Sequence, residues 1–313
     1  MKKALVCTMS GIGNAIHTLP LIEALYSMGY VVDVKLNSAR GAEPIFEAHP
    51  HVLCVFTEKR KCLEVYDDVF CCSYCNNNLV LEGCGSTNNH TPGLLLCDND
   101  RTPLSSIYNQ HEIDYFMDLA RRVGFRGETP KAGLPTEKPT VCIPERSVAV
   151  SIGYYKGDIR ERSRAKHWGN SKFVKLAVEL IREGYTPVFI GSAGDWERDG
   201  HNIKRILDDQ HLSTEVLFLF SQSLLEAFGA LKECCAYVGN ETCMVPAAAA
   251  LDKPTMSMSF MEAPASIRCP VKNYPYPRGT VFVGTRLQLT PKAVMKHLLR
   301  LIKDGPSQRI INL

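Results

Sequence analysis

The chain has 313 residues, more than one hydrophobic core usually organises, so we expect two domains. Hydrophobic residues make up 45% and charged residues 22% of the sequence, which is typical of a globular chain and excludes wholesale disorder. The 36 basic and 33 acidic residues leave a net charge of +3, which is too small either to indicate or to exclude nucleic-acid binding. No apolar run approaches the roughly 20 residues that span a bilayer, and no signal peptide is evident. We therefore expect a cytoplasmic protein, with peripheral binding at the inner membrane face as the alternative.

Thirteen cysteines, an odd number in a chain without an evident signal peptide, indicate reduced thiols. Cys72 and Cys75 have the spacing of zinc ligands, but no second such pair completes a tetrahedral site. Further candidate ligands surround them, namely Cys62, Cys71, Cys84, His90 and Cys97. We interpret all of these as buried or loop residues and expect no metal ligand.

The first half of the chain alternates between strand and helix patterns. Apolar runs predict strands at 4–8, 31–36 and 52–56, with further strands at 66–70 and 79–81. Helical periodicity predicts helices at 16–26 and 111–123, which Gly29 and Gly124 end.

A proline-rich stretch at 127–144 is the best linker signal, and the alternation restarts after it. Strands are predicted at 148–152, 187–190, 216–220, 236–238 and 255–258, and helices at 171–183, 202–207, 224–232, 244–251 and 291–303. The pattern predicts two doubly wound α/β domains, 1–145 and 146–313. Ligands of such sheets bind at the carboxyl ends of the strands, so the cleft between the halves is the expected site.

Glycine-rich or polar loops follow several predicted strands. Gly11 and Gly13 are expected to form a turn before the first helix, where a ligand could approach the backbone. Ile16 breaks the dinucleotide-binding pattern G-x-G-x-x-G, so a glycine turn that binds no ligand is an equal alternative. Lys166 lies at the end of a basic loop. This loop could bind a diphosphate, or it could be a solvated surface loop without a ligand. Asp195 and Glu241 lie in the stretches 191–197 and 239–242, which follow predicted strands, and they could bind a ligand or act as acids in the first turn of a helix.

Together these segments resemble glycosyltransferase family 9, the heptosyltransferase-like enzymes of GT-B fold, over essentially the whole chain. Residues 11–20 look like the family's opening G-D-x-x-x-T-x-P, and 166–168 look like its K-x-W segment. Residues 191–197 are similar to its G-G-x-x-E stretch. The most specific likeness is that of 239–255 to G-N-D-T-G-x-x-H-x-A-A-A-L-x-x-P-T. The resemblance implies two Rossmann-like domains facing across a cleft, with 1–145 on the acceptor side and 146–313 binding the nucleotide sugar.

The resemblance also implies an enzyme that moves a sugar from a nucleotide-diphosphate donor to a hydroxyl acceptor, a saccharide of the bacterial envelope, with inversion. It implies no cofactor and no metal, because basic side chains stabilise the leaving diphosphate. The implied donor-binding residues are Lys166, Ser192, Asp195, Glu241, Thr242 and Cys243, and the implied acceptor-side loop contains Ser10, Gly11 and Gly13.

The sequence departs from the family pattern where the chemistry is expected. Asn14 replaces the aspartate proposed as general base, and an amide cannot accept a proton at neutral pH. His17 follows about one helical turn later, so we expect Asn14 to orient the acceptor hydroxyl and His17, or an unidentified carboxylate, to accept its proton. A packing or capping role for His17 is the alternative. Glu241, Cys243 and Pro246 replace the family's Asp, Gly and His, which leaves the donor sugar open.

Two other functions stay open at this point. A glycosyltransferase acting on hydroxymethylated bases of phage DNA would use the short basic segments 59–61, 121–122 and 160–164 to hold phosphates. A degenerate protein would bind a nucleotide sugar without turnover.

Overall fold

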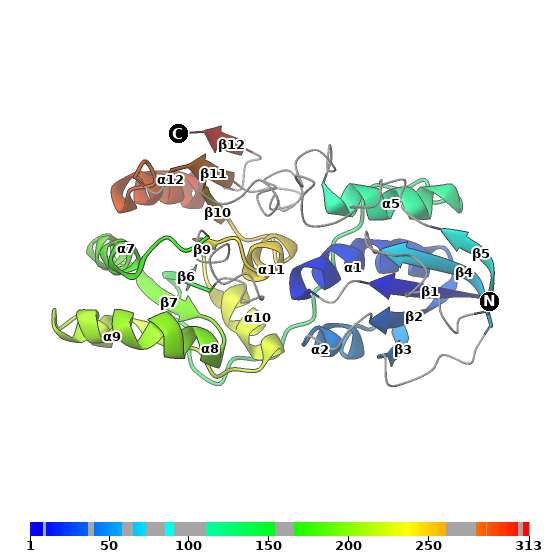
Figure 1. Cartoon of the computed structure of the whole chain (residues 1–313), viewed down its shortest axis with the longest axis horizontal. Helices are drawn as coiled ribbons and strands as arrows, with labels where there is room; N and C mark the ends of the chain where they lie inside the picture. Colours follow the sequence, from blue (N-terminus) through cyan, green and yellow to red (C-terminus); the bar gives the residue numbers. More distant parts are fainter. Residues whose placement is uncertain are drawn as a thin grey trace. The chain divides into compact units, whose positions relative to one another are not determined.

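The computed structural model describes residues 1–8, 11–36, 41–57, 65–72, 85–90, 111–153, 166–260, 280–285, 287–305 and 309–312. The chain divides into two compact units, Met1–Pro135 and Thr136–Leu313 (Figure 1). The division lies inside the proline-rich stretch 127–144. The domain ranges 1–145 and 146–313 stay a prediction.

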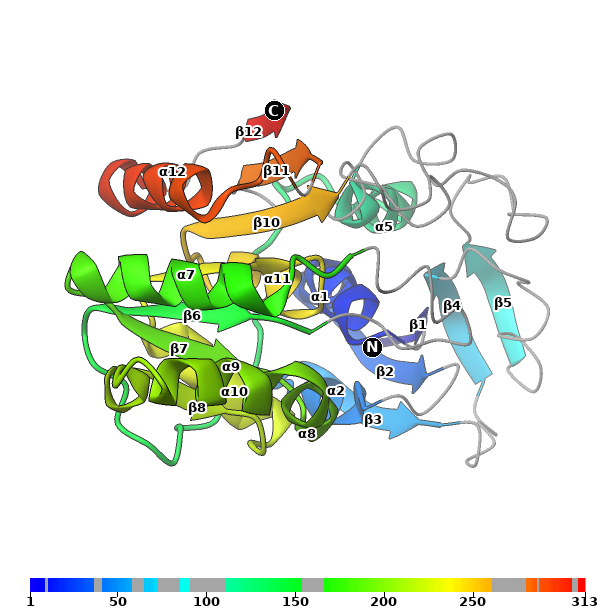
Figure 2. The same ribbon diagram turned by 60° about the vertical axis from the view of Figure 1, so that its left-hand side comes forward.

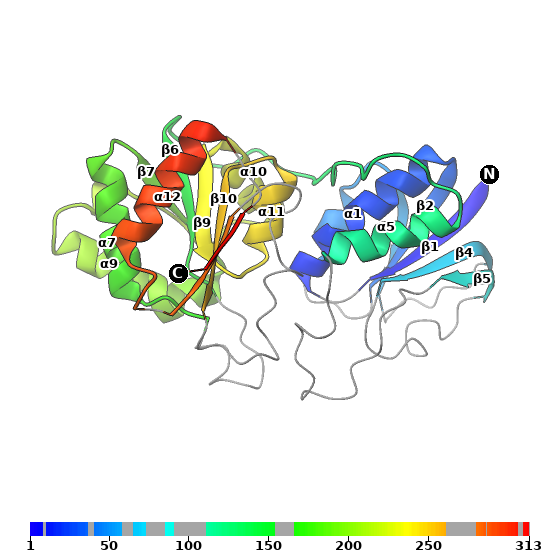
Figure 3. The same cartoon turned by 90° about the horizontal axis from the view of Figure 1, so that it is seen from above.

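The N-terminal unit contains a parallel sheet with the strand order β3-β2-β1-β4-β5. Its strands are β1 (Lys2–Thr8), β2 (Tyr30–Leu36), β3 (Val52–Phe56), β4 (Val65–Cys72) and β5 (Gly85–His90). Its helices are α1 (Ile12–Ser27), α2 (Glu43–Glu47) and α5 (Glu112–Arg122), and α1 packs beside α5 (Figure 3). The order reverses at β1 and β4, and this reversal places the start of α1 where ligands of doubly wound sheets bind. The strand predicted at 79–81 lies outside the described residues.

Helix α1 begins at Ile12, four residues before the predicted start at residue 16. Gly13 and Asn14 therefore lie in its first turn. The helix continues through Pro20, which cannot donate a backbone hydrogen bond. Burial of nearly every side chain from Ala15 to Leu25 compensates for that loss.

Two tyrosine–aspartate hydrogen bonds connect β2 with β4, the strands on either side of β1. Tyr30 donates to Asp68 over 2.8 Å, and Tyr66 donates to Asp33 over 2.9 Å. His90 on β5 also donates to Asp68, with its Nε2 2.8 Å from Oδ1. Burial alone would raise the pKa of Asp68, but the hydrogen bonds from His90 and Tyr30 outweigh it and hold the pKa below its ordinary value.

The C-terminal unit contains a parallel sheet with the strand order β12-β11-β10-β9-β6-β7-β8. Its strands are β6 (Ser147–Ser151), β7 (Thr186–Ile190), β8 (Leu217–Leu219), β9 (Ala236–Asn240), β10 (Thr255–Phe260), β11 (Thr280–Gly284) and β12 (Arg309–Asn312). Its helices are α7 (Asn170–Arg182), α8 (Ala193–Asp195), α9 (His201–Asp208), α10 (Leu224–Glu233), α11 (Met244–Ala250) and α12 (Pro291–Asp304), with a π-helical turn at Trp196–Gly200 and a 3₁₀ turn at Ser213–Glu215.

Helices cover both faces of this second sheet. Helices α7, α9 and α12 lie on one face, and α10 and α11 lie on the other (Figure 2). A parallel sheet covered on both faces is the doubly wound α/β architecture that the sequence predicted. None of the described helices is both long and apolar enough to cross a membrane.

Trp168 anchors the segment that leads into α7. Its side chain is buried, its Nε1 donates to the Leu289 carbonyl over 2.7 Å, and its ring meets Phe173 edge-on at 5.1 Å. A buried indole needs such a hydrogen-bond partner.

Candidate functional site

In the N-terminal unit, Asn14 and His17 meet at one carboxylate, that of Glu112. His17 Nδ1 lies 2.7 Å from Glu112 Oε2, and Asn14 Nδ2 donates to Glu112 Oε1 over 3.2 Å. Glu112 is fully buried and His17 is 4% exposed. The packing of α1 against α5 thus joins the two residues that the sequence singled out, with a third that it did not.

The hydrogen bond to Glu112 fixes the tautomer of His17. An ionised carboxylate can only accept, so His17 Nδ1 carries a proton, and in the neutral form of the ring Nε2 would carry the lone pair. A base oriented by a buried carboxylate is the arrangement that recurs in acid–base catalysis. His111, which accepts from the Ile113 amide at the start of α5, packs edge-on against His17 at 4.9 Å.

The acceptor-side loop is described only in part. Gly11 is the N-cap of α1, and no side chain caps the helix there. A Cβ at Gly11 would lie 3.3 Å from Asn14 Oδ1, so glycine leaves room for the amide. Gly13 lies in the first turn, and Ser10 lies outside the described residues.

In the C-terminal unit, Lys166 and Glu241 form an ion pair. Lys166 Nζ lies 2.9 Å from Glu241 Oε2, and the two side chains are 17% and 6% exposed. The other carboxylate oxygen, Oε1, is buried and has no hydrogen-bond partner among the described residues. The structure therefore brings two predicted donor-binding residues together and leaves one of their oxygens able to accept a further hydrogen bond.

The carboxyl ends of β6 and β9 supply more polar groups beside this pair. Thr242 Oγ1 lies 3.0 Å from Ser151 Oγ and accepts from the Met244 amide over 3.2 Å. Asn240 Nδ2 donates to the Ile152 carbonyl over 3.0 Å, whereas its buried Oδ1 has no partner in the described part of the chain. The strand order reverses between β6 and β9, which is the position of ligand sites in doubly wound sheets.

Ser192 and Asp195 cap the short helix α8 after β7. The Asp195 amide donates to Ser192 Oγ over 3.2 Å, and the Ser192 amide donates to Asp195 Oδ2 over 2.9 Å. Asp195 is also ion-paired with Arg198. A Cβ at Gly153 would lie 3.1 Å from Asp195 Oδ1, so this carboxylate sits against the backbone that follows β6. The structure assigns Asp195 a capping role, and its contact with a ribose stays a prediction.

Burial favours the neutral thiol at two of the candidate cysteines, Cys72 and Cys243. Burial, with a contribution from the Asp195 charge, raises the pKa of Cys243 to about 11, so its thiol is protonated at neutral pH. Cys71 and Cys72 are buried at the end of β4, and burial raises the pKa of Cys72 well above its ordinary value, which disfavours the thiolate that zinc binds. Cys62, Cys75, Cys84 and Cys97 lie outside the described residues.

The match to a protein-family model lies within the C-terminal unit. Residues 155–300 match the model of glycosyltransferase family 9 (heptosyltransferase). Lipooligosaccharide heptosyltransferase 2 of Haemophilus influenzae is 32% identical over 122 residues, which is 39% of this chain and 34% of that protein. Lipopolysaccharide heptosyltransferase 2 of Salmonella typhimurium is 32% identical over 113 residues, 36% of this chain and 32% of that protein. The chain thus matches about a third of the length of these curated relatives.

Similar solved structures extend over nearly the whole chain. The glycosyltransferase family 9 structure from Veillonella parvula has a TM-score of 0.72 at 14% identity, covering 97% of this chain and 98% of that one. Escherichia coli ADP-heptose heptosyltransferase II has a TM-score of 0.68 at 21% identity, covering 96% and 99%. At such identities the likeness concerns the fold, and it confirms the predicted GT-B architecture.

Proposed function

We propose that the protein, whose residues 155–300 match the model of glycosyltransferase family 9, transfers a sugar from a nucleotide-diphosphate donor to a hydroxyl of a saccharide acceptor. Its curated relatives are heptosyltransferases of lipooligosaccharide and lipopolysaccharide, so ADP-heptose is the first donor to test. The DNA-modifying alternative gains no support from the comparisons. The cytoplasmic location stays a prediction.

The observation that carries the donor side is the polar cluster beside β6 and β9. The Lys166 ammonium has three N–H donors, so it can bind a diphosphate oxygen while it remains paired with Glu241. The buried oxygens Glu241 Oε1 and Asn240 Oδ1 are acceptors that sugar hydroxyls would satisfy. A cation beside the leaving diphosphate supports metal-independent transfer.

The acceptor side of the proposal uses the cluster of Asn14, His17 and Glu112. The Asn14 amide orients the acceptor hydroxyl, and His17 Nε2 accepts its proton as the oxygen bonds to the anomeric carbon. The nucleotide diphosphate leaves from the opposite face, and this single displacement inverts the anomeric centre. Glu112, through its bond to His17 Nδ1, holds the ring and stabilises the imidazolium.

A structural role for the same pair is the competing interpretation. Both side chains are almost completely buried, which also suits a bond that fixes α1 against α5. The two interpretations differ in turnover, since a lost base lowers kcat and a lost packing contact lowers stability.

Calorimetry and a transfer assay test the function. We expect ADP or another nucleoside diphosphate to bind at one site. With ADP-heptose as the donor, the release of ADP should depend on an added lipopolysaccharide-core acceptor. If the donor binds but no saccharide acceptor causes release of the nucleoside diphosphate, the result would support the alternative of a degenerate protein that binds a nucleotide sugar without turnover. Failure of every nucleotide and nucleotide sugar to bind would refute the proposal.

A further inference from the structure

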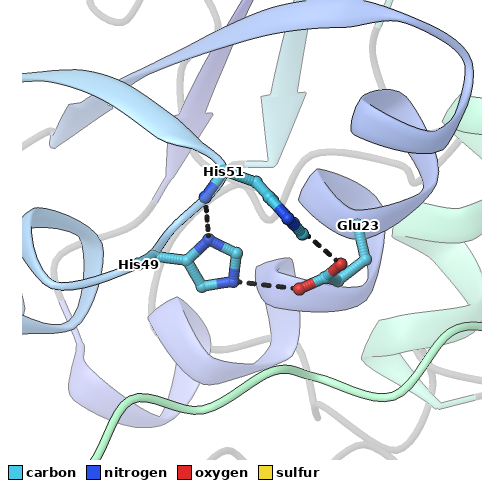
Figure 4. A group of neighbouring side chains, drawn as sticks. All are labelled: Glu23, His49 and His51. Atoms are coloured by element: carbon cyan, nitrogen blue, oxygen red, sulfur yellow. Dashed lines mark hydrogen bonds and ion pairs between the residues drawn. The ribbon is translucent and has the colours of Figure 1, made fainter.

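Three side chains from two segments of the N-terminal unit converge on one point (Figure 4). Glu23 lies on α1, and His49 and His51 lie between α2 and β3. Glu23 Oε1 is 3.3 Å from His49 Nε2, and Glu23 Oε2 is 3.0 Å from His51 Nδ1. One potential ligand atom from each residue lies within 4.8 Å of the other two.

These separations suit a tetrahedral zinc ion. Zinc bonds to imidazole nitrogen and carboxylate oxygen are about 2.0–2.1 Å long, which places neighbouring ligand atoms of a tetrahedron about 3.3 Å apart. The observed separations of 3.3 Å to Glu23 Oε1 and 3.0 Å to Glu23 Oε2 lie close to that value, although they end on different oxygens of the carboxylate. One ligand atom from each of the three residues lies within 4.8 Å of the others, so a single ion would draw the three side chains together toward the tetrahedral spacing.

The surroundings of His49 also favour the binding of a metal ion. His49 is 2% exposed, and its buried Nε2, which faces Glu23 Oε1 at 3.3 Å, makes no hydrogen bond of good geometry in the part of the chain that the structure describes. Gly133 lies beside it with a φ of 56°, a conformation that favours glycine. A Cβ there would collide with Glu23 Oε1 and lie 3.3 Å from His49 Nε2, so this glycine keeps side-chain atoms out of the space beside both ligand atoms.

We propose that Glu23, His49 and His51 bind one Zn²⁺ ion, with water as the fourth ligand. The ion ties the second half of α1 to the segment before β3. Glu23 is six residues beyond His17, about 9 Å along the helix axis, so the site is separate from the proposed base. The proposal does not depend on the glycosyltransferase activity.

Metal binding requires a change of tautomer in both rings. In the described state His51 Nδ1 donates to Glu23, and His49 Nδ1 accepts from the His51 amide over 3.3 Å. On binding, each ring stays neutral and moves its proton to the nitrogen that does not bind zinc. The long amide contact to His49 Nδ1 is lost, while Tyr26, stacked on His51 at 3.6 Å, can keep that ring in place.

Zinc competition measures the site in the full-length protein. Metal-free protein titrated with Zn²⁺ against a chromophoric chelator should bind one ion per chain in a site that His51→Gln and Glu23→Gln each weaken at least tenfold. His201→Gln is the matched control, since His201 also packs against an aromatic ring, that of Trp196, but lies in the other unit. This variant should bind zinc as the wild type does.

Cobalt distinguishes this site from the thirteen cysteines. Co²⁺ bound to two histidines and a carboxylate gives tetrahedral d–d bands without the near-ultraviolet thiolate-to-cobalt band. Saturating zinc, at about a hundred times Kd, should also raise the wild-type Tm by several degrees. Absence of one-to-one binding, a thiolate band, or unchanged affinity in both folded variants would overturn the proposal. If a variant fails to fold, the stoichiometry and cobalt spectrum of the wild type decide.

Discussion

Replacing Lys166 by alanine tests the donor side directly. The change removes an ammonium that lies 2.9 Å from Glu241 Oε2 and is proposed to hold the diphosphate. A hydrogen bond to a charged group contributes about 1.5–3 kcal/mol. Nucleoside diphosphate affinity should therefore fall roughly 10- to 150-fold, because ~1.4 kcal/mol corresponds to a factor of ten.

Glu241 makes a second contribution, which a double-mutant cycle separates from the first. In Lys166→Ala the carboxylate, 6% exposed, loses its cation and repels an incoming diphosphate. Removing one partner of a fully buried pair costs about 3–5 kcal/mol of stability, and we expect less here because Lys166 is 17% exposed. Glu241→Gln removes the repulsion, so it should preserve or raise ADP affinity. The double variant should bind ADP more tightly than Lys166→Ala alone.

Calorimetry with ADP measures the affinities, and urea unfolding of each variant measures the stability. The Glu241→Gln variant is the matched control, since it keeps the shape of the side chain and the Lys166 charge. Wild-type ADP affinity in a folded Lys166→Ala protein would remove Lys166 from the donor site. If Glu241→Gln lowered the ADP affinity as much as Lys166→Ala does, the division of roles between the two residues would be refuted.

Three further predictions concern the fold and the proposed base. His17→Ala and Glu112→Gln should each lower kcat, His17→Ala by about 10²–10⁴-fold, whereas reduced stability with near-normal kcat would identify a structural pair. The lowered pKa of Asp68 means that the unfolded chain binds more protons than the folded chain at acidic pH. The contribution of Asp68 to folding stability is therefore present above the unfolded pKa and is lost as the pH falls through the folded pKa. Asp68→Asn should therefore flatten the acid decline of stability in urea unfolding between pH 7 and pH 3, and an unchanged decline would contradict this assignment. Trp168→Phe leaves the Leu289 carbonyl without its donor and should cost about 1–3 kcal/mol. An unchanged urea midpoint at constant slope would show that the bond contributes nothing.

Strands buried on both faces were predictable from the sequence, because they form nearly continuous apolar runs. The runs at 4–8 and 148–152 correspond to β1 and β6. Strand β5, Gly85–His90, was missed because its sequence GSTNNH contains no apolar residue. It is an edge strand, and it is a strand because it pairs with β4 and not because of its amino-acid composition.

The candidate site was predictable only where a short motif carried it. Lys166 and Glu241 were both placed on the donor side through family motifs, but their mutual ion pair was not foreseen. Glu112 lies 95 residues from His17 and is a typical acid of a first helical turn, so no local pattern indicated its contact. The pair His49-x-His51 was a usable signal, but its third member, Glu23, becomes a neighbour only through the packing of α1.

The two tyrosine–aspartate bonds that cross β1 bear on how the N-terminal sheet assembles. Apolar side chains alone discriminate weakly between strand alignments that keep the same face inward, since one valine can replace another. The two hydroxyls reach their carboxylates in one alignment of β2 with β4, and a misaligned β4 would leave Asp33 and Asp68 buried without these donors. The bonds therefore act against mispaired sheets, so their loss should increase kinetic trapping and aggregation during refolding.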